Sequence, residues 1–226
     1  MEPGLSIIMP VFNEAEGIGA ALAALAGLRR AGVQLIVVDG GSTDTTLQGC
    51  DGAADLVLSG PRGRARQMNF GAAHASGELL LFLHADTRLP DHAARLVRDA
   101  LADGRHEWGR FDVSIAGKSR AFAVIACLMN WRSRLTAIAT GDQAMFVRRA
   151  AFDGVGGFPD QPLMEDVELS RRLRRRGRPA CLRERVVTSG RRWERDGIAR
   201  TVLLMWRLRL LYWLGVSPEQ LKRSYR

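Results

Sequence analysis

The sequence predicts an α/β fold, with a mostly parallel, Rossmann-like sheet and helices on both of its faces. Short runs of consecutive apolar residues recur along the first half of the chain, which is typical of strands buried on both sides. Segments with apolar residues at helical spacing separate these runs. The chain has 226 residues, which is enough for one large domain of this class.

In the first half, we expect strands at 5–11, 35–38, 55–58 and 79–83, and helices from Ile18 to Leu28 and up to about Gly77. Ser42 or Asp44 could cap a further helix after the second strand. In the second half, apolar patterns predict helices at 91–102, 121–138, 165–176 and 198–214, with strands at 108–115 and near 144–147.

The apolar run Leu79–Leu83 ends in His84 and Asp86, two potential metal ligands at alternate positions. Ligands of open α/β sheets bind beyond the carboxyl ends of the strands, and this pair lies at such an end. The alternative interpretation is a core strand followed by a polar turn.

Acidic groups lie at several other expected strand or helix ends, at Asn13-Glu14, Asp39 and Glu165-Asp166. A parallel sheet would gather the strand-end groups on one edge, where carboxylates could accept from a base and a ribose. A metal on Asp86 could bridge phosphate oxygens. The alternative for each acidic residue alone is a helix cap or a solvated turn.

Cationic and glycine residues could complete such a site. Arg62 and Arg64 could pair with phosphates, and glycines beside Ser42, including Gly41, allow close backbone approach to a ligand. The run Arg191-Arg192-Trp193 could clamp a diphosphate, or it could be surface charge with a packed indole.

Glu165-Asp166 could provide a general base that takes the proton from an incoming hydroxyl group. The alternative is that both acids only favour the dipole of the helix they begin.

The net charge of +9 is unevenly distributed. Residues 171–226 contain 17 Lys and Arg against four Asp and Glu, which indicates an anionic partner. The three cysteines, in no metal-binding spacing, predict a reduced, cytoplasmic protein, and we expect no signal peptide and no membrane-spanning segment.

The basic, apolar segments 121–138 and 198–214 favour a peripheral position on the anionic inner face of a membrane. In the second segment Arg200 and Arg207 share a helix face, but Arg209 lies opposite. The alternative is a C-terminal helix packed on the domain.

Together these motifs resemble the family 2 glycosyltransferases of the GT-A fold. Four motifs carry the resemblance: Pro10-Val11-Phe12-Asn13-Glu14, Val38-Asp39-Gly40-Gly41-Ser42-Thr43-Asp44, His84-Ala85-Asp86 and Glu165-Asp166. The stretch from Gly63 to Asn69 and the small size resemble a bacterial subgroup named for arsenosugar biosynthesis. The family usually has Asp where this chain has His84.

The resemblance implies an inverting transfer of sugar from a nucleotide-diphospho-sugar, with a UDP-sugar preferred, to a hydroxyl of a lipid or small-molecule acceptor. It implies that Asp166 is the base and that Mg²⁺ or Mn²⁺ lies on Asp86. The expected donor-binding residues are Pro10, Phe12, Asn13, Glu14, Asp39, Gly41, Ser42, Arg62, Arg64, Ala85, Arg191, Arg192 and Trp193.

The expected division of the chain is a glycosyltransferase domain at 1–195 followed by a basic, apolar helical tail at 196–226. Within the domain, about 1–88 would bind the nucleotide and about 89–195 would carry the acceptor and catalytic groups.

Two other functions are compatible with parts of the sequence. A sugar-phosphate nucleotidyltransferase would need a glycine-rich basic loop after the first strand, where Asn13-Glu14 lies instead. A nucleic-acid-binding protein would use the basic C-terminal region, but no recognition motif is present there, so we expect no nucleic-acid partner.

Overall fold

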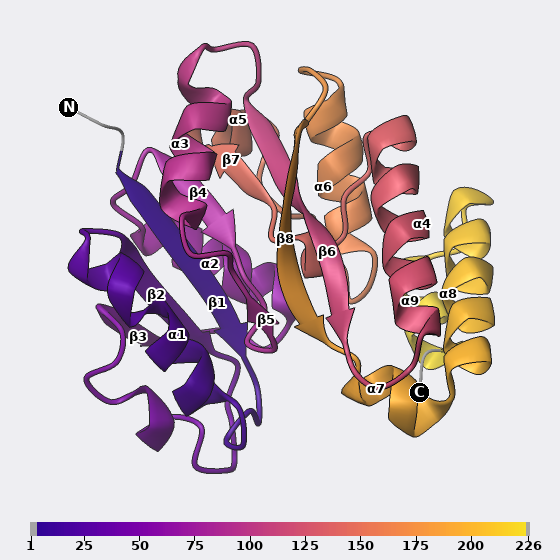
Figure 1. The fold of residues 1–226 in the computed structure, drawn as a ribbon, viewed down its shortest axis with the longest axis horizontal. Coiled ribbons are helices and arrows are strands. Elements are labelled where there is room, and N and C mark those ends of the chain that lie inside the picture. The colour runs from indigo at the N-terminus through magenta and orange to yellow at the C-terminus, as the bar shows by residue number, and fades with distance from the viewer. Residues whose placement is uncertain (1–3, 225–226) are drawn as a thin grey trace.

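The apolar runs form the centre of an eight-stranded sheet in the computed structural model, which describes residues 4–224 (Figure 1). The strands are β1 (Leu5–Val11), β2 (Gln34–Asp39), β3 (Leu56–Ser59), β4 (Leu79–Phe82), β5 (Thr87–Arg88), β6 (Trp108–Ala116), β7 (Phe146–Arg148) and β8 (Ala180–Ser189). Their order across the sheet is β3-β2-β1-β4-β7-β6-β8-β5.

The predicted α/β fold is confirmed, and the sheet is parallel only in part. Strands β3, β2, β1 and β4 pair in parallel, as do β6 and β8. Strand β7 is antiparallel to both β4 and β6, and β5 is antiparallel to β8. The first half of the chain thus forms a parallel, Rossmann-like sheet, and the second half extends it as a mixed sheet.

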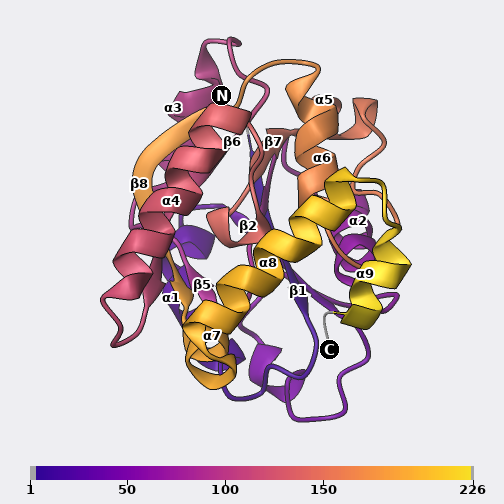
Figure 2. The ribbon, with the colours of Figure 1, turned by 90° about the vertical axis from the view of Figure 1, so that its right-hand side faces the viewer.

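Helices cover both faces of this sheet (Figures 1 and 2). They are α1 (Ile18–Arg30), α2 (Arg64–His74), α3 (Ala93–Ala102), α4 (Ala121–Thr136), α5 (Arg149–Gly154), α6 (Glu165–Arg174), α7 (Arg191–Asp196), α8 (Ile198–Trp213) and α9 (Pro218–Ser224). Alternate residues of β1 enter different cores: Ile7 and Met9 pack with α1 and α3, and Ile8 packs with α2 and α6.

The prediction of an α-helix directly after the second strand is wrong. Between β2 and β3, all of which is described, the helical segment is a short 3₁₀ helix, η1 (Gln48–Cys50). Ser42 and Asp44 bind the loop after β1 instead of capping a helix. Ser42 Oγ accepts from the Asn13 N–H at 2.9 Å, and Asp44 Oδ2 accepts from the Ala15 N–H at 3.2 Å. These tertiary hydrogen bonds compete with helix formation.

Strand β8 and helix α7 were absent from the sequence prediction. The middle of β8 is exposed and charged at Arg183, Glu184 and Arg185, so it lacks the alternation of a half-buried strand. Its pairing with β5 places the Ser189 N–H 3.2 Å from the Asp86 carbonyl oxygen. Helix α7 begins two residues later, so this pairing brings α7 to the end of β4.

The C-terminal helices pack on the domain through a small third cluster. Leu208 of α8 and Leu221 of α9 are buried there with Met164, which precedes α6. Figure 2 shows α8 crossing the face of the molecule next to α4. Within residues 4–224, no helix is long and apolar enough to cross a membrane.

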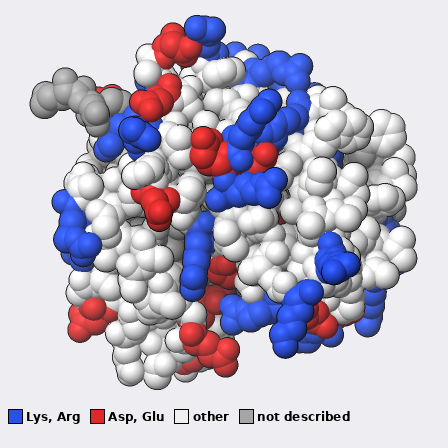
Figure 3. Space-filling model, in the orientation of Figure 1, with Lys and Arg blue, Asp and Glu red and all other residues white. Residues whose placement is uncertain are grey.

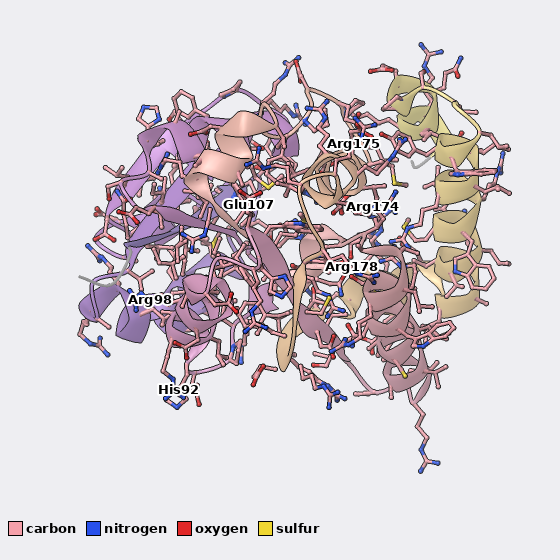
Figure 4. The ribbon with its side chains drawn as sticks, turned by 90° about the horizontal axis from the view of Figure 1, so that it is seen from above. His92, Arg98, Glu107, Arg174, Arg175 and Arg178 are labelled. Atoms are coloured by element: carbon pink, nitrogen blue, oxygen red, sulfur yellow. The ribbon has the colours of Figure 1, made fainter. Side chains whose placement is uncertain are left out.

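Several arginines at the end of α6 are occupied within the fold. Arg174 donates to the Thr136 carbonyl at 2.9 Å and Arg178 to the Arg134 carbonyl at 2.9 Å, so both bind the end of α4. Arg176 pairs with Glu107 at 2.7 Å. Figure 4 labels Glu107, Arg174 and Arg178 at this end of the molecule. Part of the basic excess therefore supports the structure.

Candidate active site

A cleft of about 240 Å³ lies beyond the ends of β1 and β4, bounded by α6, α7 and α8. The elements that meet there are far apart in sequence. They meet because the pairing of β8 with β5 brings α7 back to the loop after β4. Ten of the predicted site residues line this cleft: Pro10, Glu14, Arg64, His84, Ala85, Asp86, Glu165, Asp166, Arg192 and Trp193.

The other predicted residues lie in the neighbouring loops after β1, β2, β3 and β8: Phe12, Asn13, Asp39, Gly41, Ser42, Arg62 and Arg191. Asp39 is buried and accepts from the Gly41 N–H at 3.0 Å and the Ser42 N–H at 3.0 Å. Ser42 Oγ donates to the same carboxylate. Asp39 thus holds the glycine-bearing loop in one shape.

Asn13 joins the loops that follow β1 and β2. It has a left-handed backbone, with φ of 54°, and its Oδ1 accepts from the Thr43 N–H at 2.8 Å. At the rim of these loops, the Arg62 guanidinium lies 4.2 Å from the centre of the Phe12 ring, a cation–π contact. The first two motifs therefore form one connected surface.

Gln67 of α2 forms hydrogen bonds with the backbone where β1 and β2 lead into these loops. Its side-chain N–H group donates to the carbonyls of Val11 and Val38, both at 2.8 Å. The Gln67 side-chain amide also packs closely on Gly40: a Cβ added to Gly40 would lie 3.0 Å from the amide carbon and oxygen. Gln67 satisfies carbonyl groups near the ends of two buried strands, which explains a buried polar residue in this helix.

Carboxylates gather at the end of the cleft nearest β1. Burial raises the pKa of Glu14, and the charge of Asp86 raises it further. Arg64 faces the same region, 3.6 Å from Glu165. Glu165 is buried, and this burial together with the charge of Asp166 raises its pKa despite Arg64.

His84 turns toward Asp142 rather than into open space. The two are 3.5 Å apart, between His84 Nδ1 and Asp142 Oδ1. Burial acts to raise the pKa of Asp142, but the hydrogen bond and charge of His84, with Arg64 and Arg209, outweigh it and lower the pKa. The imidazole packs tightly on Gly141, where a Cβ would lie 2.4 Å from the ring.

Asp166 is held at the start of α6 by backbone donors. Its Oδ2 accepts from the Gly141 N–H at 2.8 Å and its Oδ1 from the Val167 N–H at 2.7 Å. The preceding residue, Met164, has a left-handed backbone with φ of 64°, which turns the chain into the helix. These contacts fix one carboxylate at the wall of the cleft.

Residues outside the predicted set also line the cleft, and among them are Thr140, Asp142 and Arg209. Asp142 lies in the polar turn before β7, and Arg209 is the arginine that faces away from Arg200 and Arg207 on α8. The position of Arg209 on the opposite helix face from the other two arginines was the sequence feature that could have marked it as a cleft residue. The sequence held no comparable sign for Thr140.

The comparisons with known proteins agree with this geometry. The sequence model described as glycosyl transferase family 2 matches residues 6–156, about two thirds of the chain.

The chain belongs to glycosyl transferase family 2.

Two curated mycobacterial relatives share part of the chain. An uncharacterized glycosyltransferase of Mycobacterium tuberculosis is 39% identical over 102 residues, which is 42% of this chain and 39% of the relative. A PGL/p-HBAD biosynthesis glycosyltransferase of Mycobacterium bovis BCG is 38% identical over 112 residues, which is 46% of this chain and 43% of the relative. The matches thus span less than half of these relatives.

Solved glycosyltransferase structures share the fold. Residues 1–349 of S. aureus TarS, in complex with UDP-GlcNAc, superpose with a TM-score of 0.66 at 18% identity, covering 82% of this chain and 58% of that TarS chain. Mannosyltransferase PcManGT of Pyrobaculum calidifontis, in complex with GDP-Man and Mn²⁺, gives a TM-score of 0.62 at 25% identity, covering 83% of this chain and 57% of that protein. The GT-A expectation is confirmed.

Proposed function

We propose that this family 2 glycosyltransferase transfers a sugar with inversion from a nucleotide-diphospho-sugar, a UDP-sugar first, to a hydroxyl of a lipid or small-molecule acceptor. The observation that carries the proposal is that Glu14, Asp86 and Asp166 line one cleft at the ends of β1 and β4. Solved relatives with UDP-GlcNAc and GDP-Man support the donor class.

In the proposed donor site, the loops after β1 and β2 hold the base and ribose, with Asn13, Asp39 and Ser42 at their centre. Arg64 and the Arg192-Trp193 pair lie on the same cleft, where they would bind the diphosphate. Arg191 reaches across to Glu16, 3.9 Å away, and so would join α7 to the loop after β1.

In the proposed reaction, the acceptor hydroxyl oxygen bonds to the anomeric carbon as the bond from that carbon to the diphosphate oxygen breaks. The hydroxyl proton passes to Asp166, and the nucleoside diphosphate leaves. Asp166 suits this role better than Glu165, because Glu165 is buried and faces Arg64. The backbone donors on Asp166 would hold its orientation during transfer.

The residues at the donor end fit a divalent cation. Burial raises the pKa of Glu14, and the negative charge of Asp86 raises it further, so these two carboxylates lie near each other. Carboxylate oxygens are ligands that suit Mg²⁺ and Mn²⁺. Within residues 4–224, no three His, Cys, Asp or Glu side chains form a metal-binding group. Asp86 would therefore be the main protein ligand of the cation. His84, which faces Asp142, remains the second predicted ligand. When bound, the cation would stabilise charge on the leaving diphosphate.

An anionic membrane surface fits the face formed by α4 and α8. Large apolar side chains are exposed along both helices: Val124, Leu128, Trp131, Leu135, Leu203, Trp206, Leu210 and Trp213. Figure 3 shows a broad, largely uncharged region over these helices. Exposed cations flank them at Lys118, Arg120, Lys222 and Arg223. Flotation with phosphatidylglycerol vesicles tests this part, and Trp131→Ser with Trp206→Ser should reduce it; a protein that stays unbound would contradict it.

The donor chemistry is tested with a panel of nucleoside diphosphates in the presence and absence of Mn²⁺. A ligand at 100 times its dissociation constant should stabilise the protein by about 2.7 kcal/mol, which a thermal shift detects. Release of nucleoside diphosphate from a nucleotide-sugar supports glycosyl transfer. Pyrophosphate release from an NTP and a sugar phosphate would support the nucleotidyltransferase instead.

A further inference from the structure

Helix α8 has two faces with different surroundings. Its cleft face consists of Thr201, Met205 and Arg209, which are spaced four residues apart and line the cleft. Its outer face consists of four exposed apolar residues spaced three or four apart: Leu203, Trp206, Leu210 and Trp213. The two tryptophans are 65% and 80% exposed. One helix thus forms a wall of the candidate active site and presents an apolar surface to the outside.

Contacts with α6 hold α8 in this orientation. Leu208 is fully buried in the third cluster, where it packs with Met164 at the start of α6. The Tyr212 hydroxyl donates to Glu168 of α6 at 3.3 Å. Because Asp166 lies in the first turn of α6, these contacts keep the cleft face of α8 on the same cleft as the proposed base.

The cleft is charged on one side and apolar on the other. The side formed by the ends of β1 and β4 carries the carboxylates, with Asp86 among them. The side formed by α6 and α8 carries Leu163, Val167 and Met205, which also pack on the third cluster. An acceptor that approaches Asp166 along α8 would therefore contact apolar surface, which favours a molecule with an apolar part next to its hydroxyl group.

The charge around the outer face suits an anionic bilayer. Neither α4 nor α8, which lie next to each other in Figure 2 and are both fully described, contains Asp or Glu. Arg200 and Arg207 of α8 are exposed, as are Lys118 and Arg120 before α4. Helices that lie in the interface of a membrane combine exposed indole and aliphatic groups with such cations.

The thickness of α8 then sets the depth of the cleft. An interfacial helix buries its apolar face about 5–10 Å into the boundary between head groups and acyl chains. An α-helix with its side chains is about 10–12 Å across. With the outer face in this boundary, the cleft face lies at the level of the lipid head groups, where the hydroxyl group of a membrane lipid is found.

We propose that α8 seats the enzyme on an anionic bilayer and that the acceptor is a membrane amphiphile, not a soluble small molecule. Its apolar chain stays in the bilayer, and its hydroxyl-bearing head passes beside Met205 to Asp166. The acceptor role rests on the proposed function. The transfer step is the one proposed there, with the lipid hydroxyl as the nucleophile.

Fluorescence quenching measures the depth of each face. A fluorophore is attached at Met205→Cys or at Trp206→Cys, in a protein whose accessible cysteines are removed by Cys127→Ser and Cys181→Ser; Cys50 is buried. The vesicles are phosphatidylcholine and phosphatidylglycerol, with a spin label on the head group or on the acyl chain. The head-group label should quench position 205 more strongly, and the acyl-chain label should quench position 206 more strongly.

The control position is Leu47→Cys, an exposed apolar residue in the loop between β2 and β3, and neither spin label should quench it. Absence of vesicle binding, or a position 205 that the head-group label does not quench, would overturn the placement of α8. This measurement needs no nucleotide, so it is independent of the proposed donor chemistry.

Product partition identifies the acceptor class. The donor is a radiolabelled nucleotide-sugar chosen from those whose nucleoside diphosphate binds the protein. It is incubated with vesicles of bacterial polar lipids and, separately, with the water-soluble small molecules of the same cells. Label should pass into the organic phase in the first incubation. Trp206→Ser with Trp213→Ser should reduce this transfer about tenfold or more, because less apolar surface is buried, and should leave UDP binding unchanged. Leu47→Ser should behave like the native protein.

Label found only in a water-soluble product, or no label in the organic phase while UDP binds, would overturn the lipid acceptor. Equal lipid product from the double tryptophan variant and the native protein would overturn the role of α8. Failure of UDP to bind to the native protein contradicts the proposed donor site instead, so the two proposals fail by different measurements.

Discussion

Asp166 Oδ2 accepts a hydrogen bond of 2.8 Å from the Gly141 N–H, which joins the start of α6 to the turn that precedes β7. Gly141 also packs on the imidazole of His84, so one glycine contacts both the proposed base and the end of the metal motif. The two ends of the reaction centre are thus connected by direct contact.

Asp166→Asn should abolish most of the transfer while nucleotide binding is retained. An amide keeps the shape of the side chain but cannot take the proton of the acceptor, and general bases contribute about 10²- to 10⁴-fold to the rate. The measurement is kcat for nucleoside diphosphate release, beside a thermal shift with UDP. Glu168→Gln, on the same helix and paired with Arg171 and Arg172, is the control and should keep its turnover. Unchanged turnover in Asp166→Asn would rule out this base.

Gly141→Ala should displace His84. The added Cβ would lie 2.4 Å from Cε1 and 2.5 Å from Nε2 of the ring. Both distances are shorter than a van der Waals contact allows, so the ring must move. Overpacking of this kind costs about 1–3 kcal/mol, and the His84–Asp142 pair should break. We expect a lower melting temperature and weaker UDP binding.

The control for this change is Gly27→Ala in α1, where a Cβ meets nothing within 4 Å. Alanine in an exposed helix should stabilise it by about 1 kcal/mol. A Gly141→Ala protein with native stability and native UDP affinity would show that the glycine is not needed.

Asp86→Ala should remove the metal dependence of donor binding. In the native protein, Mn²⁺ should increase the thermal shift caused by UDP, because a cation held by Asp86 would supply positive charge to the diphosphate. In the variant, UDP should give the same small shift with and without Mn²⁺. Asp91→Ala, an exposed acid beyond the same loop, should behave like the native protein. A metal response preserved in Asp86→Ala would contradict the assignment.

Glu165 predicts a pH-dependent loss of stability. Burial and the charge of Asp166 raise its pKa above the ordinary value of 4.5, so the folded state binds this proton more tightly than the unfolded state. Its stabilising contribution is complete below pH 4.5 and is lost as the pH rises through the raised pKa. Chemical denaturation of the native protein and of Glu165→Gln across this range measures the difference. The variant should lack this decline, and parallel pH profiles would contradict the prediction.

Much of the fold was predictable from local patterns. The runs at β1, β2 and β4 are apolar on both sides, and buried parallel strands leave that record in the sequence. The helix expected after β2 was wrong because Ser42 and Asp44 bind another loop, and no local pattern encodes that partner.

The sequence by itself determined the motifs and their placement at strand ends, because apolar periodicity and residue type are local properties. Only the tertiary structure decided which groups meet. The exposed, charged strand β8 gave no clear periodic signal, yet its pairing with β5 carries Arg192 and Trp193 to the cleft. The position of Arg209 on the same cleft likewise depends on how α8 packs against the start of α6. Such long-range packing follows from burial of apolar surface across the whole chain, which no single stretch of residues specifies.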